Sequence, residues 1–367
     1  MKYQVGKMGA SEGIGLTVIM SIATIFLSSP AFIAERVGTL AWVVPLVSGT
    51  MSIIAIFLLS HLFKRFSGDL LTITEQLLGN TVGKIISIYY MFIFLSSAFF
   101  SVREFSENTL LIALPDLSLN VAFICYALSA AAIVYAGIET IGRVVYLYLP
   151  FIMGSILILL LAPYPFLEFN YLFPWQGYGL NTLAENSIGL AGTQAGVIIL
   201  MVFAQSFQTA QTIRTAAIFA IGGMSILHSL IFVVIVMLFG SKVVAEMSLP
   251  LLEIARMIHL SRFFQRVEAI YIMVWVSVGI LNTAANLFTG LFLLSRLAGL
   301  PTIRPLIPAI TFIMIELSFL TPDITAFVAV ISKIYLSNFF GMLIFPIILF
   351  IAEIIKDRRK KSCNGVQ

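Results

Sequence analysis

Ten apolar stretches follow one another along almost the entire chain. An α-helix needs about 20 apolar residues to cross the hydrocarbon core of a bilayer. Hydrophobic residues make up 60% of the sequence and charged residues only 10%, whereas a soluble domain needs a polar exterior. The sequence therefore predicts an all-α membrane protein with ten transmembrane helices. The predicted spans are Ile14–Ile33, Leu40–Phe63, Val82–Val102, Leu119–Gly137, Val144–Leu161, Ala191–Ala210, Ala217–Gly240, Ala269–Leu294, Leu306–Leu320 and Ile334–Ile355.

The positive residues divide unequally between the two sides that these spans create. With ten spans, both termini lie on one side, and that side receives fourteen Lys and Arg residues against seven on the other. Because cytoplasmic loops are enriched in Lys and Arg, we expect both termini to be cytoplasmic. Residues 1–355 are predicted to form one ten-helix transmembrane domain. Residues 356–367 are predicted to form a basic cytoplasmic tail that meets anionic membrane lipid and not nucleic acid.

Two predicted spans contain polar or helix-breaking residues at mid-membrane depth. In the first span, Ser21–Pro30 combines hydroxyls, small residues and a proline; in the sixth, Phe203–Gln211 contains three glutamines and a serine. Irregular backbone at this depth is tolerated only where protein or a water-filled cavity satisfies it. A broken helix presents free N–H groups and carbonyls, which suit a zwitterion the size of an amino acid. The open alternative is that Pro30 only kinks its helix and that the glutamines bond to neighbouring helices.

Other polar residues lie deep in the remaining spans, and Asn282 in the eighth is the leading candidate among them. A buried polar group in lipid is costly unless it is paired, so each is a functional hypothesis. Most are expected to bond between helices. The sequence has no phosphate loop, metal-spaced His/Cys set or nucleophile motif, so we expect no enzyme activity, no cofactor and no metal. The other deep polar residues include Ser96, Ser97, His228, Thr283, Asn286 and Glu316.

Several short motifs resemble those of a known family. The clearest is Arg266-Val-Glu268 with Trp275 at the entry of the eighth span. Together with span count and loop lengths, the motifs resemble the spore germination permeases, the B subunits of nutrient germinant receptors. That family is part of the amino acid-polyamine-organocation superfamily. The supporting matches are Pro30, Arg103 with Glu107, Pro322 with Asp323, and Pro346.

The resemblance implies a LeuT-like five-plus-five inverted repeat with broken helices 1 and 6. It further implies a receptor subunit in the inner membrane of the spore. This subunit would bind a small nutrient of the amino acid class and trigger germination with an A subunit and a lipoprotein C subunit. Because the family tends to have glycine in both breaks and Ser21–Ile25 and Phe203–Ser206 contain none, we expect milder breaks here. By position, the ligand-binding residues would include Ala23, Thr24, Ser28, Phe92, Ser96, Ala204, Gln205, Ser206 and Asn282.

Two alternatives stay open at this point. A secondary amino-acid transporter can use the same fold, since fold alone does not fix function. Coupled transport usually needs a membrane-embedded acid or lysine, and the first, fifth, sixth and eighth predicted spans have none near mid-depth. Sodium can also be held by carbonyls and hydroxyls, so the transporter is disfavoured but not rejected. A purely structural subunit without a ligand is the third possibility. Arg266 and Glu268 are predicted to anchor the outer loop as an ion pair.

Overall fold

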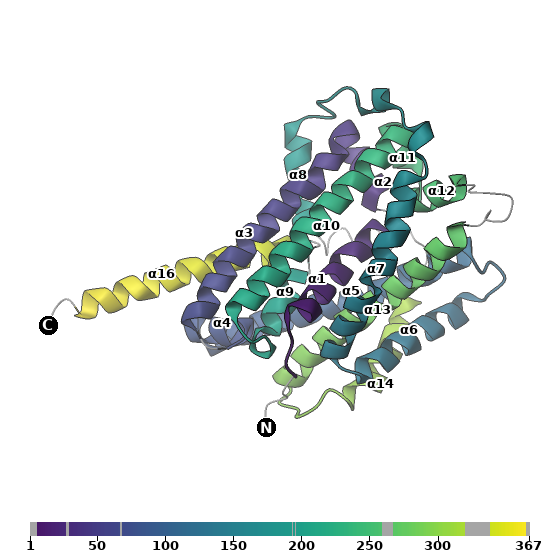
Figure 1. Ribbon diagram of the computed structural model, residues 1–367. Coiled ribbons are helices and arrows are strands. Elements are labelled where there is room, and N and C mark those ends of the chain that lie inside the picture. The colour runs from purple at the N-terminus through teal and green to yellow at the C-terminus, as the bar shows by residue number, and fades with distance from the viewer. Residues whose placement is uncertain are drawn as a thin grey trace.

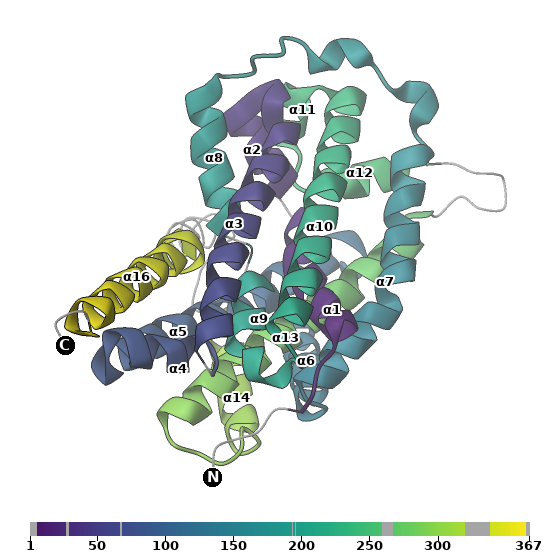
Figure 2. The same ribbon diagram turned by 60° about the vertical axis from the view of Figure 1, so that its left-hand side comes forward.

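The fold is a bundle of helices whose two ends differ. A computed structural model describes residues 6–26, 29–66, 68–192, 194, 196–258, 267–319 and 338–364. Within these residues there is no β-strand, only an isolated bridge between Met8 and Phe207. Figures 1 and 2 show the N-terminus and helix α4 at one end of the bundle, with α2, α8 and α11 at the other. We call these ends the N-terminal face and the loop face.

The described helices fall on nine of the ten predicted spans and the sixth is displaced along the chain, so the all-α, ten-span architecture is confirmed. The first five spans are α1 (Ala10–Ile25) with α2 (Ser29–Val37), α3 (Val43–Arg65), α5 (Asn80–Ile112), α6 (Leu119–Tyr135) and α7 (Ile138–Leu161). The next five are α8 (Leu180–Gly192) with α9 (Gly196–Val202), α10 (Ala210–Phe239), α13 (Val267–Leu297), α14 (Leu306–Ser318), and a π turn (Phe340–Ile344) followed by α16 (Phe345–Asn364). Short helices connect them: α4 (Leu70–Leu78), α11 (Ser241–Glu246), α12 (Pro250–Met257), and 3-10 turns at Gly38–Trp42, Tyr164–Phe166, Phe169–Leu172 and Ala204–Ser206.

The sixth span lies earlier in the chain than the sequence predicts. It runs over Leu180–Val202, with its interruption between Gly192 and Gly196, and not over Ala191–Ala210. Its most apolar window has a mean hydropathy of only 1.2 but is 75% buried, whereas the window in Ile138–Phe166 has 2.4 and is 28% buried. A span enclosed by protein does not need an apolar surface, because lipid does not touch most of it.

The polar stretch Phe203–Gln211 therefore follows the sixth span instead of breaking it. It contains the turn Ala204–Ser206 and the start of α10. The hydroxyl of Thr209 accepts a hydrogen bond from the Thr212 N–H at 3.1 Å and so caps that helix. The expectation of a sixth break without glycine is also wrong, because the observed break lies between Gly192 and Gly196.

Helix α1 occupies the centre of the bundle and packs against α7, α9, α10 and α13. Its contact with α7 is close because two glycines face each other: a Cβ on Gly15 would overlap the carbonyl oxygen of Gly142. Next to this contact, Glu12 and Arg143 form an ion pair at 2.9 Å. The start of α1 is thereby fixed to the start of α7.

Helix α16 extends outward from the bundle, as the yellow ribbon in Figures 1 and 2 shows. It is attached to α3 by Arg65, which contacts Glu353 and Asp357 at 2.8 Å each. The basic tail predicted from residue 356 onward continues this helix through Asn364.

Candidate ligand site at two helix breaks

The break in the first span is confirmed, and two nearby hydroxyl groups bond to carbonyls near the end of α1. α1 ends at Ile25 and α2 begins at Ser29. The Thr24 hydroxyl donates to the Ser21 carbonyl at 2.8 Å, and the Ser29 hydroxyl donates to the Thr24 carbonyl at 2.7 Å. Pro30 is the second residue of α2, where its missing N–H costs no helical bond. Two carbonyls near the end of α1 thus accept hydrogen bonds from residues close to them in the chain.

The break in the sixth span depends on a close approach to α1. A side chain at Gly196 would place its Cβ 2.9 Å from the Cα of Thr17, which is too short for any contact. Only glycine therefore allows α9 to begin against α1. Gly192 ends α8 on the other side of the interruption.

One hydrogen bond joins the two breaks. The Ser21 hydroxyl donates to Oε1 of Gln194 at 2.6 Å. The side chains are 2% and 4% exposed, so water does not compete strongly for the bond. The bond links α1, one turn before its end at Ile25, to the sixth break. Free carbonyl ends and N–H ends of broken helices are the groups that a broken-helix ligand site requires.

Helix α13 forms a wall beside these breaks. Its Tyr271 ring lies 5.5 Å from the ring of Phe26, the residue that follows α1. Farther along, Phe292 lies 4.9 Å from Phe203 at the end of the sixth span. The same helix therefore contacts both the first break and the C-terminal end of the sixth span.

Asn282 on α13 is bonded to the third span. Its amide donates to the Ser101 hydroxyl at 3.1 Å. Ser96 instead donates to the Ile93 carbonyl of its own helix at 3.0 Å. Phe92 is 60% exposed and lies on the outer surface of α5.

The predicted residues Ala204, Gln205 and Ser206 lie at the N-terminal face and not at a break. The Ser206 carbonyl accepts a hydrogen bond from the Met8 N–H at 2.8 Å. A side chain at Gly13 would meet the Phe207 ring. This segment therefore closes over the first turns of α1. Ala23 and Thr24, in contrast, lie in the last turn of α1, directly before the first break.

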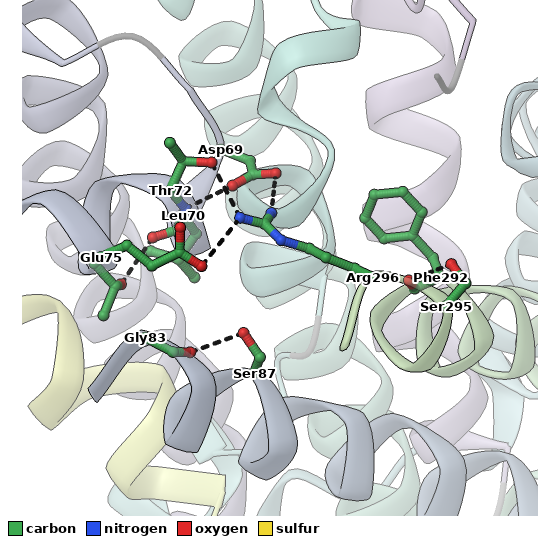
Figure 3. A network of polar contacts seen from close by, with 10 residues as sticks. Asp69, Leu70, Thr72, Glu75, Gly83, Ser87, Phe292, Ser295 and Arg296 are labelled. Atoms are coloured by element: carbon green, nitrogen blue, oxygen red, sulfur yellow. Dashed lines mark hydrogen bonds and ion pairs between the residues drawn. The ribbon is translucent and has the colours of Figure 1, made fainter. Parts of the chain in front are cut away.

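A second closure of the N-terminal face is centred on Arg296, at the end of α13 (Figure 3). Its guanidinium contacts the Asp69 carboxylate at 2.5 Å and the Thr72 hydroxyl at 3.1 Å. It also contacts Glu75 at 3.5 Å. Asp69 caps α4 as well, accepting from the Thr72 N–H at 2.8 Å. The ion pairs of Arg296 thus hold the end of α13 against α4.

Three of the described motif residues, Arg103, Glu107 and Trp275, have structural contacts. Arg103 pairs with Glu107 and donates to the Ser318 carbonyl at the end of α14. Trp275 is completely buried, with its ring 5.4 Å from that of Phe105. Glu268 lies in the first turn of α13. Ser28, Arg266, Pro322 and Asp323 lie outside the described residues.

The residues that sequence reasoning missed are Gln194 and Gly196. The signal was present as Leu190-Ala-Gly-Thr-Gln-Ala-Gly196, in which two glycines enclose polar residues inside an apolar run. It was overlooked because the predicted span began at Ala191, which placed these residues at a membrane surface.

Comparison with known proteins agrees with the fold. The profile of the family described as spore germination protein matches residues 7–327. A search of curated proteins gives no match. Among solved structures, the chain is similar to MHP1, a nucleobase-cation-symport-1 family transporter determined in a closed conformation with bromovinylhydantoin bound. The TM-score is 0.64 at 13% identity, over 92% of this chain and 76% of that one.

The likeness to the transporter shows the fold alone at this identity. The profile match, however, covers most of the sequence, from the start of α1 to beyond α14. Family and fold together describe a multi-pass membrane protein of the permease or receptor type and not an enzyme. The chain belongs to the spore germination permease family.

Proposed function

We propose that this protein is the membrane subunit of a nutrient germinant receptor. In this proposal a small nutrient of the amino acid class binds where the breaks of the first and sixth spans meet. Binding triggers germination through an A subunit and a lipoprotein C subunit in the inner membrane of the spore. Both termini are cytoplasmic, so that the N-terminal face is the inner one.

The observation that carries this proposal is the bond between Ser21 and Gln194. It joins two broken helices through side chains that can turn toward a ligand without unfolding either helix. A ligand that replaces this bond has different contacts with α1 and α9 in the two arrangements. Such differential contact is what shifts a protein between two states.

The polar ends of the helices favour an anionic group on the ligand. The first N–H groups of α2 have no partners within the helix and are oriented toward the break. Two carbonyls at the end of α1 already accept bonds from Thr24 and Ser29. A carboxylate at the start of α2 therefore suits the site better than an ammonium at the end of α1.

The proposed ligand contacts are Ser21, Ala23, Thr24, Ser28, Gln194 and Asn282. The placement of Ala204, Gln205 and Ser206 beside Met8 favours a role in closing the N-terminal face. Phe92 and Ser96 are left out of the proposed ligand contacts. Phe92 is exposed on the outer surface of α5, and the Ser96 hydroxyl bonds to its own helix.

Secondary transport of an amino acid is the alternative function. The transporter fold supports it. Against it, the described helices of the first, fifth, sixth and eighth spans have acidic side chains only toward the span ends. These are Glu12, Glu35, Glu139, Glu185 and Glu268. An ion-coupling acid at mid-depth is therefore lacking in these helices as far as they are described.

Reconstitution in liposomes tests both functions. We expect saturable binding of one or more members of a labelled amino-acid panel, without accumulation in a proton or sodium gradient. Accumulation driven by either gradient would instead establish a transporter. Ser21→Ala is expected to weaken binding at least tenfold, because the site loses the group that bridges the breaks.

The matched control is Ser277→Ala, which removes an exposed hydroxyl of α13 that bonds only to the Met273 carbonyl at 2.8 Å. It should leave binding unchanged. Equal binding by the wild type and Ser21→Ala, with both proteins folded, would reject the proposed site.

A further inference from the structure

The connection between α7 and α8 carries a group of aromatic side chains that the rest of the protein leaves uncovered. Between residues 164 and 178, six aromatic side chains are more than half exposed, from 54% to 73%. Glu168 is the only charged residue in this stretch of the sequence. Single exposed apolar side chains are ordinary, but a contiguous group marks a contact surface. We call this group the aromatic rim, and its members are Tyr164, Phe166, Phe169, Phe173, Trp175 and Tyr178.

The backbone of the aromatic rim is bonded to the helices that it passes. The Glu168 N–H donates to the Met237 carbonyl near the end of α10 at 2.9 Å. The Tyr178 N–H donates to the Val37 carbonyl at the end of α2 at 3.1 Å. Because these bonds hold the backbone in place, the exposure of the rings is a property of the fold and not of a loose loop.

The aromatic rim follows the outer side of the bundle. Figures 1 and 2 show the connection leaving α7, passing the loop-face end of α10 and reaching α8. Leu147 and Phe151 on α7 are 73% and 68% exposed, and α10 exposes Phe219 and Ile226 in the same way, at 70% and 58%. In a multi-pass membrane protein, large apolar side chains exposed along a span face lipid. The aromatic rim therefore lies at the loop-face edge of a lipid-facing wall.

We propose that the aromatic rim lies in the lipid headgroup region at the loop face and holds this edge of the bundle at a fixed depth in the membrane. Tyr and Trp are enriched at membrane–water interfaces, because their rings are apolar while the O–H and N–H groups can bond to water or headgroups. Tyr164, Trp175 and Tyr178 supply such groups. The rim has no Lys or Arg, so it does not require anionic lipid.

This placement also concerns the sixth span. The aromatic rim leads directly into α8, which begins at Leu180 and forms the half of the broken span before the interruption. The other half, α9, packs against α1 inside the bundle. The two halves are therefore held by different surroundings, α8 from the membrane surface and α9 from within the protein. The inference does not depend on the nutrient or on the partner subunits.

Depth-dependent fluorescence quenching tests this placement. In a background with Cys125→Ser and Cys363→Ser, Phe169→Cys is labelled with nitrobenzoxadiazole in the full-length protein in phosphatidylcholine vesicles. The vesicle lipid carries a nitroxide quencher either near the headgroup or near the end of the acyl chain. We expect quenching by the shallow nitroxide to be at least about twofold stronger than by the deep one. Addition of phosphatidylglycerol, an anionic lipid, should leave this ratio unchanged.

The matched control is Glu246→Cys with the same label, because Glu246 is an exposed polar residue at the end of α11, on the same face of the bundle. There we expect quenching by aqueous iodide and little quenching by either nitroxide. Equal quenching of the two labels by the shallow nitroxide would overturn the proposal. Quenching of the Phe169 position by iodide but not by lipid would also overturn it, since the rim would then face water and be open to a protein partner.

A second measurement uses the native Trp175 and avoids the label. The difference between the emission of the wild type and that of Trp175→Phe reports on this side chain. Phe preserves the ring that packs on Phe173 at 5.1 Å, so we expect the variant to fold. The difference emission should be quenched by lipid brominated near the headgroup, and its persistence in folded protein would count against the rim. A failure of nutrient binding would leave both measurements unaffected, so the two proposals fail separately.

Discussion

The two broken spans solve the same problem in opposite ways. In the first, the Ser21 and Thr24 carbonyls accept from hydroxyls only three and five residues away, at Thr24 and Ser29. In the sixth, Gln194 accepts from Ser21, which is 173 positions away in the chain. The absence of a side chain at Gly196 allows α9 to pack against Thr17. The first break is stabilised by residues close to it in the chain, and the sixth break is stabilised by its contact with α1.

The difference shows how stability should be distributed around the site. The first break needs little from the rest of the bundle, whereas the sixth exists only while α1 is in place. Substitutions at the sixth break should therefore disturb the whole protein, and those at the first should act locally. Three predictions test this contrast.

The largest effect is expected for Gly196→Val. Its Cβ would lie 2.9 Å from the Thr17 backbone, and an overpacked contact of this kind costs about 3 kcal/mol. Thermal unfolding in detergent should show a strongly lowered Tm. The control is Gly189→Val in α8, because a Cβ there would have no atom within 4 Å. Similar Tm values for the two variants would show that α9 does not depend on α1.

An intermediate effect is expected for Gln194→Leu. It leaves the buried Ser21 hydroxyl without its acceptor, which costs about 1–3 kcal/mol. The double variant Ser21→Ala with Gln194→Leu should be more stable than the sum of the single losses predicts, since the orphaned hydroxyl is gone. Strictly additive losses would mean that the two side chains are not coupled and that the breaks are independent.

The smallest effect is expected for Thr24→Val. It removes one short-range hydrogen bond at the first break, worth about 1 kcal/mol. Thr50→Val on α3 is the control, because that exposed hydroxyl also bonds only to its own helix, at the Leu46 carbonyl. If Thr24→Val lowered the Tm as much as Gly196→Val does, the first break would be as dependent on its surroundings as the sixth.

The same contrast explains which features were predictable from the sequence. The span number and the first break followed from apolar runs and from Ser29 and Pro30, which are contiguous signals. The sixth break did not, because α8 is half polar and becomes a membrane span only inside the bundle. The link of Asn282 to Ser101 was equally hidden, since it depends on how α5 and α13 are aligned. Features set by residues adjacent in the chain can be predicted from the sequence, whereas features set by the packing of helices against one another cannot.

The partners of Arg296 all belong to one short segment, at Asp69, Thr72 and Glu75. A shift of α13 by one helical turn, about 5.4 Å, would carry the guanidinium away from all three at once. Gradual sliding at this end would lose charge contacts without gaining others from α4. Any movement of α13 along its axis would therefore have to break the three contacts together, so this junction resists such a movement as one unit.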